Sequence, residues 1–473
     1  MEHRTDFDLQ VSQNQYLSPA DREMHAALVV TARGEAPPGA EPEVAQVILI
    51  DCSGSMSYPI TKIGAARQAT KAAIGALRDG ARFAVVEGTE RARQVFPARG
   101  LAVADEDSRR AAKDAVNNLS AAGGTAIGTW LTLAGRLLGD HPTAVRHVIL
   151  LTDGQNGEPP GELDRVLAEF GGVFTCDARG IGADWLPTEL LRVAEALHGT
   201  ADAVRAPADL AADFLAMTRT AMGKLVPEVR VLVRTTAASR LDFLRQTHPA
   251  EADLRGEVVD ERTTAFTTGS WGAESREYHL RLTVDPTGLP RSSDVRVARV
   301  DLEVRAPGAT GFAKAGDARS VVVHYTADLE RSSRIDARIA HYTGQTELRQ
   351  AVLEGGAAHD RGDRGATEAA WGRAVALATG LGNRKVLDRL LRLVDVVGAP
   401  EDGVVRLKED LAAEDLLSVA VGSTLSGTRS ESVVEPGAAP AAPTGPDVTC
   451  PGCSLRWPAG SAFCGDCGSP IAV

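Results

Sequence analysis

The sequence predicts an α/β protein in which a doubly wound, Rossmann-like unit spanning residues 44–222 is inserted in a β-sandwich. From residue 44 to 222, continuous apolar segments alternate with helical patterns, as expected of a parallel sheet covered by helices. Before and after this unit, apolar and polar residues alternate one by one, which is typical of half-buried antiparallel strands. The 473 residues also exceed what a single hydrophobic core usually holds, so we expect several domains.

Within residues 44–222, each predicted element follows from its residue pattern. We expect strands at 43–51, 81–89, 145–154 and 172–182, and a short edge strand at 91–100, where Pro97 is tolerated. We expect helices at 59–79, 106–119, 126–139, 161–170, 187–198 and 208–224. The apolar face of the first helix comprises Ile63, Ala66, Ile74 and Leu77. Its basic residues are expected elsewhere on the helix surface: Lys62, Arg67, Lys71 and Arg78.

The predicted β-sandwich combines residues 5–35 with residues 226–327. In one of its strands the apolar residues Tyr278, Leu280, Leu282 and Val284 alternate with polar residues. Similar patterns occur at 24–31, 228–236, 300–305 and 319–327. Because these strands occur on both sides of the α/β unit, we expect that unit to be inserted between strands of the sandwich.

After the sandwich, residues 331–419 return to helical periodicity and predict a small helical bundle. One helix has Val386, Leu390, Leu393 and Val397 on its apolar face, and we expect a last helix near 405–419. Residues 432–447 are rich in Pro, Ala and Gly, which predicts an extended and mobile linker.

The last predicted unit, residues 448–473, contains two C-x-x-C pairs separated by ten residues: Cys450, Cys453, Cys464 and Cys467. This spacing predicts a tetrahedral zinc site in a short zinc ribbon, because a redox role would require a βαβ context that is missing. The ribbon lacks a basic patch, so we expect it to dock on protein and not on nucleic acid. The two remaining cysteines, Cys52 and Cys176, are expected to be buried thiols without a catalytic role.

Oxygen-bearing side chains follow the predicted strands at the points where the strands end. Asp51, Ser53 and Ser55 follow the first strand, Thr125 precedes the helix at 126–139, and Asp153 ends a later strand. Ligands of open α/β sheets bind at the carboxyl ends of the strands, and Mg²⁺ prefers oxygen ligands. For any one of these residues, capping of the next helix is the alternative interpretation.

Taken together, these five residues resemble the metal-ion-dependent adhesion site of the von Willebrand factor A family. The family motif is Asp-x-Ser-x-Ser followed by a later Thr and a later Asp, and the resemblance covers residues 44–222. It implies that Ser53, Ser55 and Thr125 bind Mg²⁺ or Mn²⁺ directly, whereas Asp51 and Asp153 act through water. It also implies that an Asp or Glu of a protein partner completes the metal's ligands.

Charge and missing motifs argue against other classes of function. The formal net charge of -12 disfavours nucleic-acid and membrane partners. The N-terminus has no apolar leader and no apolar stretch is long enough to span a membrane, so we expect a soluble, cytoplasmic protein. We expect no enzyme, because the common phosphate-loop, dinucleotide, metalloprotease and hydrolase motifs are missing and no general base accompanies Asp51 and Asp153. Structural roles are expected for His141 and His147.

We therefore expect a protein-interaction or adaptor protein that binds an acidic residue of its partner through Mg²⁺. The domain order and terminal ribbon resemble bacterial family members of tellurium-resistance and kinase or phosphatase signalling clusters. This resemblance implies a role in bacterial stress or signalling complexes. The alternative is an accessory subunit of an AAA+ ATPase, as in chelatase-type enzyme complexes.

Overall fold

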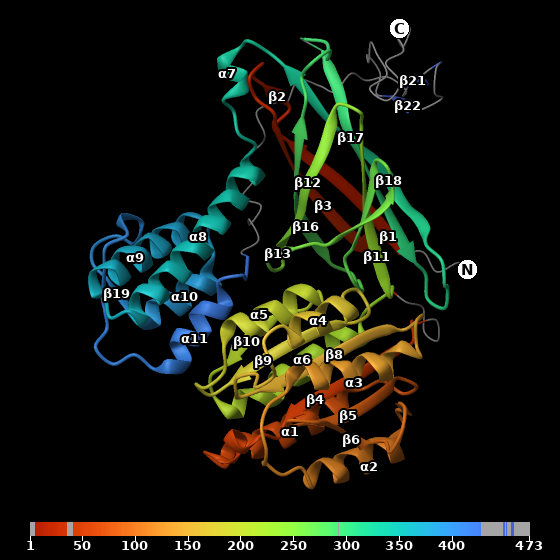
Figure 1. The fold of residues 1–473 in the computed structure, drawn as a ribbon, viewed down its shortest axis with the longest axis vertical. Coiled ribbons are helices and arrows are strands. Elements are labelled where there is room, and N and C mark those ends of the chain that lie inside the picture. The colour runs from red at the N-terminus through yellow and green to blue at the C-terminus, as the bar shows by residue number, and fades with distance from the viewer. Residues whose placement is uncertain are drawn as a thin grey trace.

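The computed structural model describes residues 5–35, 41–291, 293–426, 448–449, 451 and 456–457. Figure 1 shows an α/β unit at the bottom, a two-sheet unit at the top and a helical unit at the left. The predicted linker at 432–447 lies outside the described residues. Within the predicted ribbon, β21 (Val448–Thr449) pairs with β22 (Arg456–Trp457) in an antiparallel arrangement.

The α/β unit is built on a sheet in the order β10-β9-β8-β4-β5-β6, with β7 also paired to β5. Its strands are β4 (Val44–Asp51), β5 (Arg82–Gly88), β6 (Ala92–Phe96), β7 (Ala102–Val103), β8 (Val145–Thr152), β9 (Thr175–Ile181) and β10 (Ala201–Val204). The neighbours β10, β9, β8, β4 and β5 run parallel, whereas β6 and β7 are antiparallel to β5. Every residue of the central strand β4 is buried.

Helices cover both faces of this sheet, which explains why β4 is apolar on both sides. Val47 and Leu49 pack in one core with α3 (Ile127–Gly139), α4 (Glu162–Phe170) and α5 (Pro187–Ala196). Ile48 and Ile50 pack in another core with α1 (Thr61–Ala76), α2 (Glu106–Asn117) and α6 (Leu210–Met222). The predicted α/β fold is confirmed.

The two-sheet unit consists of one sheet in the order β1-β3-β16-β12-β13 and another in the order β14-β15-β11-β17-β18-β2. Its strands before the α/β unit are β1 (Asp6–Gln13), β2 (Tyr16–Leu17) and β3 (Glu23–Arg33). Those after it are β11 (Glu228–Thr235), β12 (Ser239–His248), β13 (Ala252–Asp253), β14 (Gly256–Asp260), β15 (Thr263–Thr267), β16 (Ser275–Val284), β17 (Asp294–Arg305) and β18 (Ala313–Tyr325).

In these sheets, strands that precede the α/β unit in the chain pair directly with strands that follow it. Strand β3 pairs with β16, and β2 pairs with β18. Residues of the main strands of both sheets pack in one shared hydrophobic core, for example Leu28 of β3, Leu280 of β16 and Val231 of β11. The chain thus leaves this unit after β3, forms the α/β unit and returns at β11.

The helical unit contains α7 (Leu329–Ser332), α8 (Ala337–Asp360), α9 (Arg364–Gly380), α10 (Arg384–Leu393) and α11 (Ala413–Gly422). The helix predicted at 405–419 is wrong over its first half, because β20 (Val405–Leu407) pairs with β19 (Val394–Val396) in a short hairpin. This hairpin also ends α10 before Val397, which is 42% exposed and does not belong to the helix's buried face. Val386, Leu390 and Leu393 are buried as expected.

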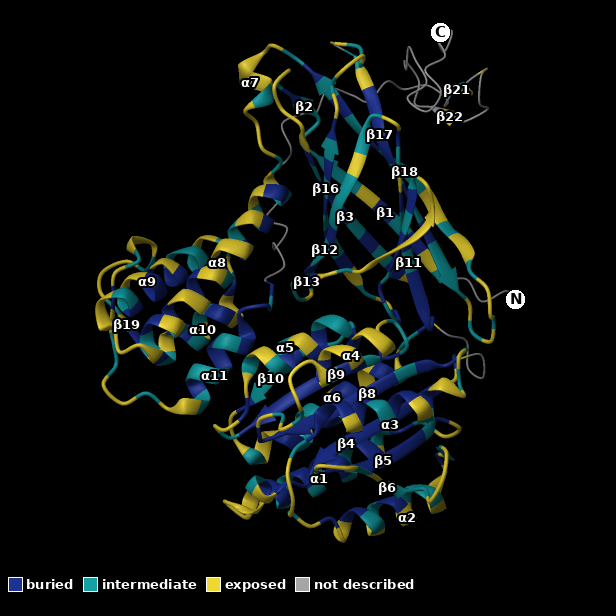
Figure 2. Cartoon of the chain, viewed as in Figure 1, coloured by how far each residue is buried: buried dark blue, intermediate teal, exposed yellow. Residues whose placement is uncertain are grey.

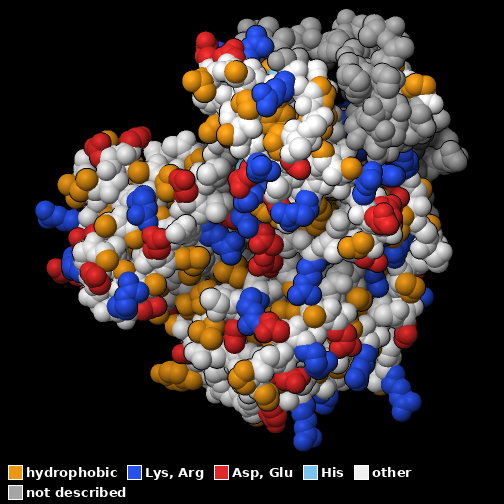
Figure 3. Space-filling model, turned by 45° about the horizontal axis from the view of Figure 1, so that its top comes forward, with side chains coloured by type: hydrophobic (Ala, Val, Ile, Leu, Met, Phe, Trp, Pro, Cys, Tyr) orange, Lys and Arg blue, Asp and Glu red, His pale blue; other side chains and the backbone are white. Residues whose placement is uncertain are grey.

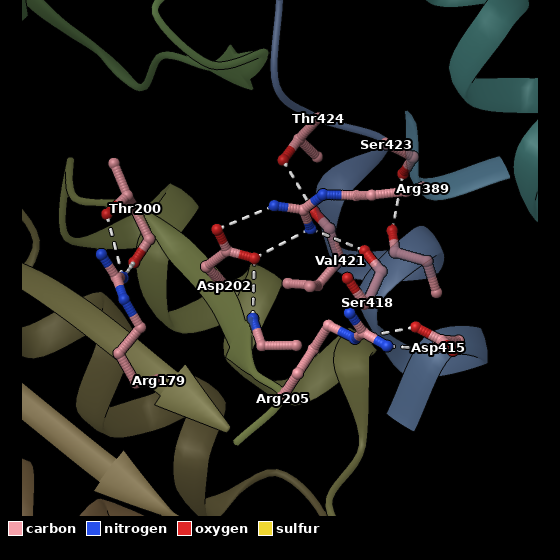
Figure 4. A network of polar contacts seen from close by, with 12 residues as sticks. Arg179, Thr200, Asp202, Arg205, Arg389, Asp415, Ser418, Val421, Ser423 and Thr424 are labelled. Atoms are coloured by element: carbon pink, nitrogen blue, oxygen red, sulfur yellow. Dashed lines mark hydrogen bonds and ion pairs between the residues drawn. The ribbon is translucent and has the colours of Figure 1, made fainter. Parts of the chain in front are cut away.

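The helical unit docks on the edge strand β10 through charged side chains, which Figure 4 shows in detail. Arg389 of α10 donates to both carboxylate oxygens of Asp202, at 2.8 and 2.9 Å. Beside this pair, Oδ1 of Asp415 in α11 lies 2.9 Å from Nε of Arg205 and 2.9 Å from Nε of Arg392. Val421 of α11 joins the hydrophobic core of the α/β unit. An exposed sheet edge is thereby covered.

Burial follows these packing relations, as Figure 2 shows: the central strands β4 and β8 of the α/β sheet are almost entirely buried, the edge strand β6 is partly exposed, and the outer faces of the helices are exposed. Among the residues that the structure describes, no helix is both long and apolar enough to cross a membrane.

Candidate metal centre

Three loops meet at the carboxyl edge of the parallel sheet, where the chain changes its direction of winding. Asp51 is the last residue of β4, and Asp153 directly follows the neighbouring strand β8. From β4 the chain continues to β5 on one side, while β8 lies on the other side, so β4 and β8 flank the switch point. Ligands of open α/β sheets bind at this position.

Asp51 organises the base of the site. Its side chain is fully buried, and its Oδ1 accepts a hydrogen bond from the backbone N–H of Ser53 at 2.8 Å. Its Oδ2 accepts hydrogen bonds from the Thr152 hydroxyl at 2.6 Å and from the backbone N–H of Asp153 at 3.4 Å. Burial raises the pKa of the Asp51 carboxyl, and these hydrogen bonds to the carboxylate oppose that shift. Asp51 therefore holds together the loops that follow β4 and β8.

Ser53, Ser55 and Asp153 form a continuous line of oxygen atoms. The two serine hydroxyls lie 2.9 Å apart, and the Ser55 hydroxyl donates to Oδ1 of Asp153 at 2.7 Å. Ser55 is carried on the 3-10 turn η1 (Gly54–Ser57) that follows β4. The backbone N–H of Gly54 donates to the carbonyl of Gly123 at 2.9 Å, which ties this turn to the loop that carries Thr125.

Thr125 joins the same cluster from the loop before α3. A β-carbon added to Gly154 would lie 3.1 Å from Oγ1 of Thr125 and 3.5 Å from Oγ of Ser55, so both hydroxyls border one point. The carbonyl of Thr125 accepts a hydrogen bond from Gly157 at 2.8 Å, which links it to the loop after Asp153. The structure thus brings together all five predicted residues: Asp51, Ser53, Ser55, Thr125 and Asp153.

Lys62 is the main residue that the sequence pattern placed wrongly. The pattern predicts Lys62 away from the apolar face of α1, but its side chain is buried, and its Nζ lies 2.7 Å from Oδ2 of Asp153. Asp184, which is exposed, lies 3.9 Å from the same nitrogen. One physical signal in the sequence could have indicated that Lys62 forms an ion pair. Lys62 occupies the first turn of α1, where the helix dipole disfavours a cation.

The loop after Asp153 also fixes the start of α3, and sequence reasoning missed this role. Glu158 accepts hydrogen bonds from the backbone N–H groups of Gly128 and Thr129, at 2.7 and 3.0 Å. Asn156 accepts one from Ile127 at 3.0 Å. The residue at the N-cap position, Ala126, has no side chain that could do this. The position of Thr125 therefore depends on the loop that carries Asp153.

The donor set fits a hard divalent ion. Adjacent ligands in an octahedral Mg²⁺ site with bonds of roughly 2.0 to 2.1 Å stand about 3 Å apart, a separation that the Ser53 and Ser55 hydroxyls already have. The part of the chain that the structure describes contains no group of three or more His, Cys, Asp and Glu side chains suited to a metal ion. The cluster described above offers three hydroxyls and two carboxylates, which are fewer than the six oxygen ligands that Mg²⁺ prefers.

The other residues singled out in the sequence lie away from this centre or outside the described residues. Cys52 and Cys176 are free and buried, and burial raises the pKa of the Cys52 thiol to about 12, which agrees with inert packing. His147 lies 2.9 Å from Asp177, and His141 lies 3.5 Å from Glu43. The predicted zinc ligands Cys450, Cys453, Cys464 and Cys467 lie outside the described residues.

Comparison with known proteins places this geometry in a family. The family model described as von Willebrand factor type A domain matches residues 45–203. A protein described as von Willebrand factor type A from Catenulispora acidiphila is 41% identical, with a TM-score of 0.82 over 89% of this chain and 97% of that chain. The chain belongs to the von Willebrand factor type A family.

The resemblance to another protein of known structure extends beyond the α/β unit to most of the chain. The ArnB paralog VWA2 from Sulfolobus acidocaldarius is 12% identical, with a TM-score of 0.52 over 89% of this chain and 100% of that chain, and so shares the fold. No curated protein matches the chain. In this von Willebrand factor type A protein, the family's Asp-x-Ser-x-Ser motif begins at Asp51, at the centre of the site described above.

Proposed function

We propose that this protein is a non-enzymatic interaction protein that binds an acidic residue of a protein partner through Mg²⁺ or Mn²⁺. Ser53, Ser55 and Thr125 would bind the metal directly, and Asp51 and Asp153 would act through water. When bound, the metal supplies an electrophile for the partner's Asp or Glu carboxylate. The observation that carries the proposal is the contact of Ser55 with Asp153, because it joins two loops of the family motif at ligand spacing.

The surface beside the site supports protein docking. Tyr58 and Ile60 follow the η1 turn, and both are large apolar side chains that are 85% and 78% exposed. Exposed apolar and aromatic side chains next to a polar centre are typical of protein interfaces. On the face that Figure 3 shows, Lys and Arg side chains are interspersed with Asp and Glu, which supports a protein partner over nucleic acid.

Further parts of the proposal concern the surrounding units. We infer that the two-sheet unit is a β-sandwich carrying the α/β unit as an insertion, and that the chain acts in the cytoplasm in bacterial stress or signalling complexes. Cys450, Cys453, Cys464 and Cys467 would bind zinc in a terminal ribbon that provides an additional protein contact. Protein kinases or phosphatases would be suitable partners for such a role in signalling complexes.

Affinity purification with the wild-type chain and with a variant carrying both Asp51→Ala and Asp153→Ala tests the interaction. In Mg²⁺, the wild type should retain a partner that is released by EDTA and that the variant does not retain. A matched control is Asp107→Ala together with Asp114→Ala, two carboxylates of α2 outside the site. If the partner stays bound in EDTA and to the Asp51 and Asp153 variant, the interaction does not use the metal centre.

A further inference from the structure

Lys62 places a cation inside the candidate metal centre. Its side chain is buried, and its Nζ contacts Oδ2 of Asp153 at 2.7 Å while Oδ1 of the same carboxylate accepts the Ser55 hydroxyl. The backbone of Gly182, at φ +77°, leaves room for the amine, because a β-carbon there would lie 2.9 Å from Nζ. The cation is therefore part of a built arrangement and not a surface side chain that happens to point inward.

The charges of the buried residues determine the net charge of the site when a metal ion is bound. Asp51 and Asp153 are fully buried carboxylates, and Lys62 compensates one of them. A divalent ion added to these three groups would leave one positive charge in excess. Asp184 lies near Lys62 but is largely exposed, so solvent screens its contribution. Uncompensated charge beside buried groups is unfavourable, so one further negative charge would stabilise the loaded site.

We infer that Lys62 is a counter-charge that makes tight divalent-metal binding depend on the carboxylate of the partner. This inference rests on the proposed function. In the absence of a partner, Lys62 weakens metal binding by electrostatic repulsion while it stabilises Asp153. When a carboxylate completes the metal's ligands, the excess charge is removed. Because coupling between two ligands is reciprocal, the same lysine makes carboxylate binding depend strongly on the metal.

The test compares wild type with Lys62→Met, which keeps the length of the side chain and removes its charge. Lys71→Met is the matched control, since Lys71 lies on the same helix and contacts Asn117, away from the site. Calorimetric titration with Mn²⁺ alone should show at least about tenfold tighter binding to Lys62→Met, or about 1.4 kcal/mol. The affinity of Lys71→Met for Mn²⁺ should equal that of the wild type.

Acetate, substituted for chloride at constant ionic strength, serves as the probe for the partner's carboxylate. It should tighten Mn²⁺ binding to the wild type and to Lys71→Met, and should have a smaller effect on Lys62→Met. Thermal unfolding provides an independent readout: without metal, Lys62→Met should unfold at a lower temperature because Asp153 is left unpaired, and Mn²⁺ should raise its unfolding temperature more than that of the wild type.

The outcomes separate this inference from the proposed function. If the wild type binds Mn²⁺ and Lys62→Met binds it with equal or lower affinity, the counter-charge role is wrong and the metal centre stands. An equal effect of acetate on both proteins also contradicts the inference. If none of the proteins binds Mn²⁺, although their circular dichroism spectra show that all are folded, both the metal centre and the role of Lys62 are wrong.

Discussion

Arg389 binds Asp202 through two parallel hydrogen bonds, of 2.8 and 2.9 Å, and this ion pair joins α10 of the helical unit to the edge strand β10 of the α/β unit (Figure 4). The arginine also donates to the backbone carbonyl of Ser418 at 2.7 Å. Two-point arginine–carboxylate pairs are more specific in geometry than single contacts. The pair therefore fixes the helical unit at one position on the sheet edge.

Removing Arg389 should loosen this junction. We expect Arg389→Met to lower the free energy of unfolding by about 1–3 kcal/mol, because it leaves Asp202 partly buried without its main partner. Urea unfolding measures the loss, and hydrogen exchange should accelerate at β10. Arg373→Met removes an exposed ion pair with Glu354 and should change stability by less than about 1 kcal/mol. Equal effects of the two substitutions would show that the junction does not depend on the Arg389 pair.

Glu158 should influence metal binding without being a ligand. We expect Glu158→Ala to lower the free energy of unfolding by about 1–2 kcal/mol, because Gly128 and Thr129 lose their acceptor, and to weaken Mn²⁺ binding several-fold by releasing Thr125. The control is Asp105→Ala, which removes the cap of α2 outside the site. Asp105→Ala should lower the free energy of unfolding about as much as Glu158→Ala does, and it should leave the affinity for Mn²⁺ unchanged. Unaltered Mn²⁺ binding by Glu158→Ala would show that α3 capping does not position Thr125.

Acid should weaken the ion pairs of Glu274 with Lys224, which lies between α6 and β11, and with Arg276 of β16. Burial alone would raise the pKa of Glu274, but Arg276 and Lys224, which lies 2.8 Å away, lower it to about 2. The carboxylate therefore stabilises the folded state above the unfolded pKa of about 4.3, and this contribution is lost as the pH falls from there toward 2.

Urea unfolding of the wild type should accordingly lose up to roughly 3 kcal/mol from this group between pH values of about 5 and 2. In Glu274→Gln this loss should be missing, so its stability should depend less on pH in that window. The exposed residue Glu261, in the turn between β14 and β15, provides a control: Glu261→Gln should keep the wild-type dependence. If Glu274→Gln follows the wild-type curve, the ion pair does not contribute in this way.

Much of the α/β unit could be predicted because its elements are long and strongly patterned. The buried strand at 44–51 and the helices at 106–117 and 127–139 agree with the sequence pattern to within two residues. Short elements could not be predicted: β10 has only four residues, and the hairpin of β19 and β20 has three in each strand. Elements of this length have too few residues to show a period.

The candidate site could be predicted to the extent that its residues belong to a local motif at strand ends. Asp51, Ser53 and Ser55 are each separated by one residue in sequence, and the parallel pairing of β4 with β8 brings Asp153 beside them. The role of Lys62 depends on the direction of one side chain, which helical periodicity does not determine. Glu158 could not be predicted either, because it acts on backbone N–H groups 30 residues away.

The central claim is that Asp51, Ser53, Ser55, Thr125 and Asp153 share one divalent ion. Calorimetric titration with Mn²⁺ of the wild type and of the variant with both Asp51→Ala and Asp153→Ala tests it most directly, with circular dichroism to establish that both are folded. The account predicts one Mn²⁺ bound at this site in the wild type and none in the variant. A folded variant that still binds Mn²⁺ with wild-type affinity and stoichiometry would contradict it.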